Sequence, residues 1–159
     1  MAKTQPDLAQ VARIARVIKL ESICWREVSA KRFVELTEMP GDISFGVSHE
    51  GVGMRDIEAG QIVVLAEFKF GAHSKDSTRK VVQISGTLSL RYSLDEGLLK
   101  DFDPDLVQQF AETNGIYNAW PYWRELLQNT ASRLGLPGVI APVFRLVNLP
   151  AKKPKKAPA

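Results

Sequence analysis

Apolar positions in the middle of the chain alternate with polar ones, which is typical of a half-buried β-strand. Side chains two residues apart lie on the same side of a strand. Residues 61–71 carry one such series, and residues 80–92 carry a second: Ile62, Val64, Ala66, Phe68 and Phe70, then Val82, Ile84, Leu88, Leu90 and Tyr92. Because only a polar loop separates the two runs, we predict that they form an antiparallel hairpin.

Two further strands are predicted earlier in the chain. Residues 42–51 alternate Ile43, Phe45 and Val47 with small polar residues and glycine. Residues 17–28 are rich in β-branched and aromatic residues, which favour strands. The sequence therefore predicts about four antiparallel strands, with one face of the sheet in solvent.

Helical periodicity is found toward the two ends of the chain. Thr4 and Asp7 resemble a helix start, and apolar residues follow at helical spacing to Ile18. Asp103 before Pro104 predicts the start of a second helix, which we expect to end at Asn114 and Gly115. A third and longest helix is predicted from a cap at Asn118 to an end at Gly135 and Pro137. These elements indicate an α+β protein.

The third helix has an unusually wide apolar side. At about 100° per residue, its apolar positions span an arc of about 180°. A helix that lies on a sheet needs a stripe of roughly 100° or a little more. Part of the arc should therefore meet another helix, another subunit, a ligand or the chain's own loops.

The stretch YNAWPYWRELLQNTASRLGLPGVIAPVFRL, from Tyr117 to Leu146, resembles the C-terminal half of SecB, the ATP-independent protein-export chaperone. It also resembles SecB-like chaperones that are tied to toxin–antitoxin systems. The Pro-Tyr-x-Arg-Glu core at residues 121–125 is the specific part of the match, and residues 133–143 match the ending of the family's long helix. The resemblance implies a four-stranded antiparallel sheet with helices packed on one side, and a single SecB-like domain over residues 1–150.

The resemblance also implies a function as an ATP-independent holding chaperone, without catalysis or a cofactor. Family members hold unfolded polypeptides in apolar grooves that are lined by the long helix and by the crossover between the first two strands. In this chain the expected groove residues are Trp25, Phe33, Leu36, Met39, Trp120, Tyr122 and Trp123. The crossover is residues 29–42, and its apolar side chains could instead pin that connection to the core.

The family assembles as dimers of dimers through sheet edges and the long helix. A homotetramer is therefore expected, with subunit contacts at Leu126, Leu127, Thr130 and Leu134. SecB proper is strongly acidic where it meets the export motor ATPase, whereas this chain has a net charge of +3. Its Glu21 and Glu27 do not reproduce the acidic pair of the family. Delivery to the motor is therefore less favoured than service to an antitoxin or to clients in general.

The positive charge does not by itself indicate a nucleic-acid partner. Lys152, Lys153, Lys155 and Lys156 belong to the proline-broken tail 151–159, which is expected to be disordered, and the remaining chain is close to neutral. The apolar runs are too short to span a membrane, no signal peptide is recognisable, and a cytoplasmic protein is expected. A non-chaperone oligomeric module that binds proteins stays open as an alternative, as does a nucleic-acid-associated or enzymatic protein.

No residue is nominated for catalysis or for metal binding. Cys24 is the single cysteine and is expected to be a buried structural thiol. His49 and His73 are expected in polar loops, without a second histidine or a cysteine at ligand spacing. The sequence therefore predicts no metal site.

Overall fold

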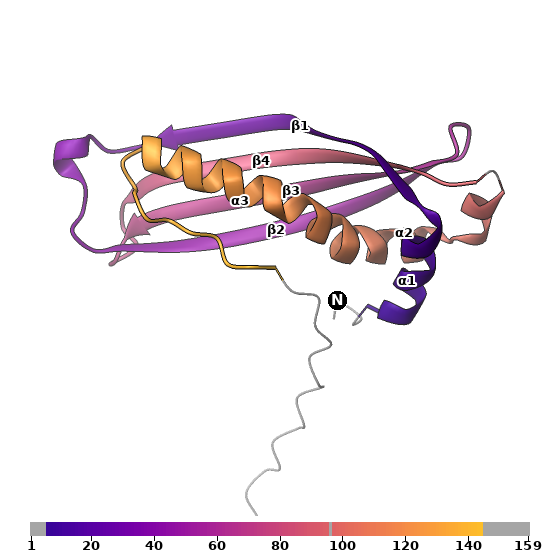
Figure 1. The fold of residues 1–159 in the computed structure, drawn as a ribbon. Helices are drawn as coiled ribbons and strands as arrows, with labels where there is room; N and C mark the ends of the chain where they lie inside the picture. The colour runs from indigo at the N-terminus through magenta and orange to yellow at the C-terminus, as the bar shows by residue number, and fades with distance from the viewer. Residues whose placement is uncertain (1–5, 96, 145–159) are drawn as a thin grey trace, which may run out of the picture.

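The chain folds as one four-stranded antiparallel sheet with helices on one face, as a computed structural model that describes residues 6–95 and 97–144 shows (Figure 1). The strands are β1 (Lys19–Arg32), β2 (Ile43–Asp56), β3 (Gln61–Ser74) and β4 (Lys80–Ser93), in the spatial order β1-β4-β3-β2. The predicted four strands and the predicted β3–β4 hairpin are confirmed. The tail 151–159 lies outside the described residues.

The two faces of the sheet differ because alternate side chains point to opposite sides. On the inner face the apolar side chains that the sequence singles out are fully buried, among them Val64, Phe68 and Leu88. On the outer face β4 presents Ser85, Thr87 and other polar residues, as predicted. The core therefore lies on one side of the sheet only.

Three helices follow from local signals, and all lie on the inner side or at one end of the sheet (Figure 1). Helix α1 (Leu8–Val17) begins at Asp7, whose carboxylate accepts hydrogen bonds from two backbone N–H groups of the first turn. Helix α2 (Pro104–Phe110) begins at the predicted cap Asp103. Short 3₁₀ turns, η1 (Leu36–Glu38) and η2 (Leu98–Asp101), lie in the crossover and before α2.

The predicted break between the second and third helices is wrong. A π-helical turn, η3 (Ala111–Gly115), joins α2 directly to α3 (Ile116–Arg133). Gly115 keeps helical angles, and a Cβ there would lie 2.7 Å from Cγ1 of Val64, so the glycine serves close packing rather than a helix end. Asn118 is not a cap; its Nδ2 donates to the Tyr92 hydroxyl over 3.0 Å.

That hydrogen bond links the centre of the helix layer to β4. Burial raises the pKa of Tyr92 to about 12, against the smaller opposing effect of Asn118, which would favour the ionised form. The phenol therefore stays protonated at neutral pH. It is a neutral polar contact in an otherwise apolar interface.

Helix α2 and η3 pack directly on the backbone of edge strand β2. A Cβ at Gly51 would lie 2.4 Å from the carbonyl oxygen of Ala111, and one at Gly53 would lie 2.6 Å from that of Val107. The side-chain amide of Gln108 accepts from the Gly53 N–H (3.0 Å) and donates to the Gly51 carbonyl (2.8 Å). Gln108 thus occupies the place of a neighbouring strand at this end of β2.

Three expectations about single residues are corrected. Cys24 is exposed, because it lies on the outer face of edge strand β1 opposite Ser89. His49 and His73 lie in strands β2 and β3 rather than in loops: His49 belongs to the alternating segment 42–51 itself, and β3 extends beyond residue 71 to Ser74. Among residues 6–95 and 97–144 no group of three potential metal ligands is found.

We predict that Gly51→Ala lowers the free energy of unfolding by about 1–3 kcal/mol, because the new methyl group would overlap backbone atoms of η3. Gly46→Ala on the same strand is the control, since no atom lies within 4 Å of the added carbon. It should be neutral or slightly stabilising. Urea denaturation of both variants measures the difference, and equal stabilities would contradict the backbone contact.

Candidate functional site

One helix cannot cover a sheet of this size. Four strands about 4.8 Å apart are wider than a helix of about 10 Å diameter. In length the two match, because α2, η3 and α3 form one continuous helix from Pro104 to Arg133, which at about 1.5 Å per residue is about as long as the 14-residue strands; the uncovered surface lies to the sides of this helix. Apolar side chains therefore remain exposed beside α3 and in the segments around it: Leu20, Val28, Leu36, Phe45, Val47, Tyr117, Tyr122, Ile140 and Val143.

Beneath α3 lies an aromatic cluster that holds the helix on β3. The Trp123 ring stacks on Phe68 with centroids 5.3 Å apart and planes 10° apart, and Trp120 meets the same ring edge-on at 5.8 Å. Trp123 and Leu127 are completely buried. The expectation that Trp123 lines a groove and that Leu127 contacts a subunit is therefore corrected, because both side chains are used inside the protomer.

The segment after α3 doubles back beside the helix, over the part of the sheet that contains β2 (Figure 1). The Ala141 carbonyl accepts from Nε of Arg124 (3.1 Å), and the Pro142 carbonyl accepts from Nε1 of Trp120 (2.7 Å). The Phe144 ring lies 5.2 Å from Trp120 and 5.4 Å from His49. The chain's own loop thus covers part of the wide apolar arc, and Trp120 is only 6% exposed.

Between this segment and the first half of α3 a hollow of about 260 Å³ stays open. Its walls are mostly aromatic or aliphatic, with one guanidinium group. The lining residues are Tyr117, Asn118, Trp120, Pro121, Arg124, Val143 and Phe144.

The crossover between β1 and β2 reaches the other end of α3. A Cβ at Gly135, just after the helix, would lie 2.5 Å from Cδ2 of Leu36 and 4.0 Å from Cε of Met39. Leu36 is nevertheless 57% exposed, and Met39 is half-buried. Both residues therefore lie against the end of α3 and also leave apolar surface in solvent, and their role in a groove stays a prediction.

Two other predicted groove residues lie apart from this contact. Trp25 is half-buried and covers Gly86, where a Cβ would be 2.5 Å from its ring. Phe33 lies beside Lys31 and Lys80, whose Nζ atoms are 5.0 and 5.7 Å from its ring centroid. The strand register places both lysines on the outer face, opposite Gln83 and His73. The structure therefore does not bring Phe33 together with Leu36 and Met39.

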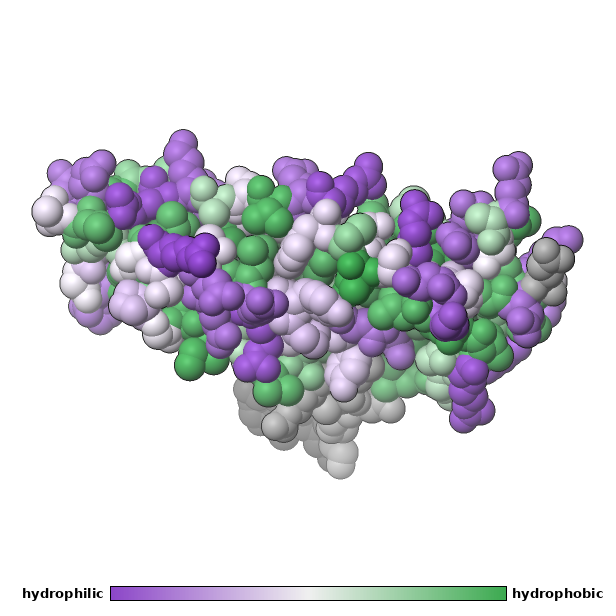
Figure 2. Space-filling model, turned by 45° about the horizontal axis from the view of Figure 1, so that its top comes forward, coloured by the Kyte–Doolittle hydropathy of each residue, from purple (hydrophilic) through white to green (hydrophobic). Residues whose placement is uncertain are grey.

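The remaining predicted residues lie along the accessible flanks of α3. Tyr122 is exposed, and Leu126, Thr130 and Leu134 are half-buried. Seen from above β1, the surface shows apolar patches interspersed with charged side chains rather than one continuous apolar area (Figure 2). Such a surface offers several small apolar contacts instead of a single large one.

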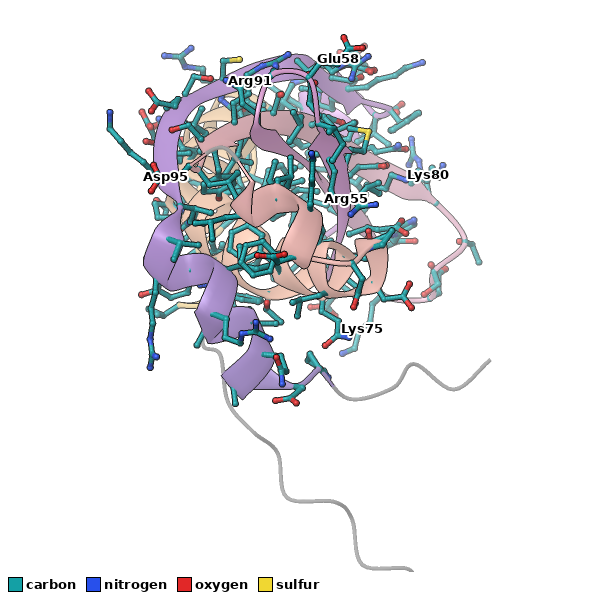
Figure 3. The ribbon with its side chains drawn as sticks, turned by 90° about the vertical axis from the view of Figure 1, so that its right-hand side faces the viewer. Arg55, Glu58, Lys75, Lys80, Arg91 and Asp95 are labelled. Carbon is teal, nitrogen blue, oxygen red and sulfur yellow. The ribbon has the colours of Figure 1, made fainter. Side chains whose placement is uncertain are left out.

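The end of the sheet beside α2 carries charged side chains, among them Arg55, Glu58, Arg91 and Asp95 (Figure 3). Arg55 turns inward, and its Nη1 donates to the Phe102 carbonyl over 2.8 Å. Arg91 lies 3.4 Å from Oε1 of Gln61 on the outer face. These contacts stabilise the strand ends, and they do not assemble nucleophile, base and acceptor in the manner of an active site.

No protein-family model and no curated protein matches the sequence. Among solved structures, the Mycobacterium tuberculosis Rv1957 SecB-like chaperone, in complex with a ChAD peptide from the Rv1956 HigA1 antitoxin, matches with a TM-score of 0.71. The match has 20% identity and covers 87% of this chain and 99% of that chain. The chain has a SecB-like fold.

The SecB-like architecture that the sequence predicted is thereby confirmed, with its open antiparallel sheet and its packed C-terminal helix. A protein of unknown function from Streptococcus agalactiae also matches, at 19% identity over 79% of this chain and 96% of that chain. Its TM-score of 0.37 is too low to establish a shared fold. No helix within residues 6–95 and 97–144 combines the length and apolar character needed to cross a membrane.

Adjacent residues of α3 should respond very differently to truncation. Trp123→Ala removes a fully buried ring that stacks on Phe68 and is expected to cost about 3–5 kcal/mol of unfolding free energy. Tyr122→Ala removes an exposed ring and should cost less than about 1 kcal/mol. Chemical denaturation measures both. Similar losses would show that α3 sits on the sheet with a different face.

Proposed function

We propose that this protein is an ATP-independent holding chaperone, which binds unfolded polypeptides and keeps them from folding or aggregating. The observation that carries the proposal is the exposed apolar surface on both sides of α3, which the protomer leaves open although its core is complete. Scattered, shallow apolar contacts suit partners that share no sequence, because an unfolded chain can meet them with different residues. The SecB-like fold and the antitoxin peptide carried by its solved neighbour support the same conclusion.

The client surface that we propose follows α3 and the crossover. Beyond the C-terminal end of α3 it comprises Leu36 and Met39. Along the first half of the helix it includes Tyr122 and the hollow next to Trp120, and Trp25 belongs to it on strand β1. Phe33 would contact a client only where the client passes around the sheet margin, because its ring lies with the outer-face lysines. Trp123 supports this surface from below through its stack on Phe68.

The outward backbone N–H and C=O groups of edge strand β2 offer a second kind of contact for a client. Gln108 bonds to Gly51 and Gly53 on the side away from β3, and the register to β3 runs without a shift. The N–H and C=O groups of Phe45 and Val47 therefore point to the same open side. Within the described part of the chain no backbone group pairs with them there. An unfolded segment can add to this edge as a strand, with its affinity independent of its side chains.

We further propose that four chains assemble as a dimer of dimers in the cytoplasm. Strand β1 is a 14-residue edge, and such an edge favours pairing with another strand unless it is covered. The half-buried residues Leu126, Thr130 and Leu134 provide apolar surface for a helix contact between the dimers. An antitoxin or a broader set of unfolded proteins is the client we favour over precursors destined for the export motor, because the chain lacks the acidic character of SecB proper.

In an aggregation assay without ATP, we expect the protein to suppress light scattering by an unfolded test protein. The double variant Leu36→Ser, Tyr122→Ser should weaken client binding about tenfold, a typical loss for central contact residues. Both side chains are exposed, so the fold should be unchanged. Val52→Ser, at an exposed apolar position on the outer face, is the control. If the wild-type protein leaves scattering unaltered, the chaperone function is refuted.

Static light scattering should give a mass four times the 17.7 kDa of the single chain. The variant Leu126→Asp places a carboxylate in the proposed helix contact, so it should weaken the assembly and yield a lower mass. Glu125→Gln, at the neighbouring exposed position, should leave the mass unchanged. A monomeric wild-type chain at micromolar concentration would contradict the tetramer.

A further inference from the structure

The hollow beside Trp120 contains a cation, Arg124, for which the described residues supply no counter-ion. Arg124 lines the hollow and uses Nε to donate to the Ala141 carbonyl, over 3.1 Å. No carboxylate among residues 6–95 and 97–144 forms an ion pair with it. A guanidinium has five N–H donors, so most of its hydrogen-bonding capacity is left for another group.

The sequence around Arg124 explains why it stays unpaired. Residues three and four positions away are neighbours on a helix surface. Here they are Trp120, Pro121, Leu127 and Gln128, and none of them carries a charge. Glu125 is adjacent in sequence but exposed, and residues at i and i+1 do not face each other on a helix. The positive charge is therefore a lasting property of the hollow.

The rest of the hollow is apolar, and its size limits what can enter. Tyr117, Pro121 and the Trp120 ring form one side, and Val143 and Phe144 form the other. Its volume of about 260 Å³ lies just below the roughly 300 Å³ at which small-molecule pockets begin. One or two side chains of an extended peptide fit it better than a folded protein does.

We propose that this hollow recognises client segments in which an apolar side chain stands next to an aspartate or glutamate. The apolar side chain enters between Tyr117, Pro121 and Val143, and the carboxylate accepts hydrogen bonds from the Nη groups of Arg124. A planar guanidinium binds a carboxylate with two parallel bonds, which gives both direction and strength. This inference rests on the proposed chaperone function and adds a preference for acidic, apolar segments to it.

Charge complementarity favours this occupant over a purely apolar one. Arg124 is half-buried, and an arginine that is partly removed from water without a counter-ion loses hydration that only an acceptor can replace. A carboxylate supplies that acceptor together with opposite charge. A hydrocarbon segment would remove more water from the guanidinium group without offering it a hydrogen-bond acceptor.

A double-mutant cycle tests the preference. The probes are two short peptides, acetylated and amidated to remove terminal charges, with the sequences Ser-Gly-Leu-Trp-Glu-Gly-Ser and Ser-Gly-Leu-Trp-Gln-Gly-Ser. Calorimetry or fluorescence titration gives their dissociation constants for the full-length protein. We expect the wild-type chain to bind the glutamate peptide about tenfold more tightly, as charge-assisted hydrogen bonds imply. Arg124→Gln should remove the difference while it retains binding of the glutamine peptide.

Two further variants separate recognition from a loss of structure. Arg124→Lys keeps the charge but not the two parallel bonds, so it should retain only part of the preference. Arg133→Gln, at an exposed position near the end of α3, should retain all of it. Equal affinities of the wild-type protein for both peptides, or no binding of either, would overturn this inference. Suppression of aggregation by the same preparation would show that the chaperone function stands independently.

Discussion

The structure depends on a mismatch of width between one helix and a four-stranded sheet. Helix α3 can bury only a strip of the inner face, so the stacked pair Trp123 and Phe68 marks the centre of the core while apolar side chains such as Leu36 and Phe45 remain uncovered. An ordinary domain would add a second long helix or another sheet over these margins. Here only the crossover between β1 and β2 and the segment after α3 approach these margins. The centre of the sheet is therefore well packed, whereas apolar side chains stay exposed along its margins.

The position of α3 is set by close backbone approaches rather than by its own caps. Glycines at 51, 53 and 115 allow the α2–η3–α3 helix to touch β2 and β3 more closely than any side chain would permit. The π-helical turn adds one residue to that helix at this point, which rotates everything after it relative to the sheet. The direction in which Trp120, Tyr122 and Arg124 point is therefore determined some ten residues before them, at the contact with β2.

The sequence was sufficient for the elements whose signal is local. The alternation along β3 and β4 depends on residues close in sequence, and so does the helix start at Asp103 and Pro104. The resemblance of residues 117–146 to SecB then allowed the fold to be predicted. Gly115 was misread because a glycine needed for packing against Val64 looks the same in sequence as one needed to end a helix. Trp123 could not be separated from Tyr122 without knowing how α3 docks. The hollow next to Arg124 could not be predicted from the sequence, because one of its walls is formed by Val143 and Phe144 in the segment that follows α3.

The side-chain amide of Gln108 also has a consequence for the growth of the sheet. It bonds to the outward Gly53 N–H and to the outward Gly51 carbonyl, so a strand that docks along β2 must end before this point. At the β2 edge the sheet can therefore be extended only along the half that contains Phe45 and Val47. This limit shortens the open part of the β2 edge on which strands of other chains could stack into a cross-β fibre.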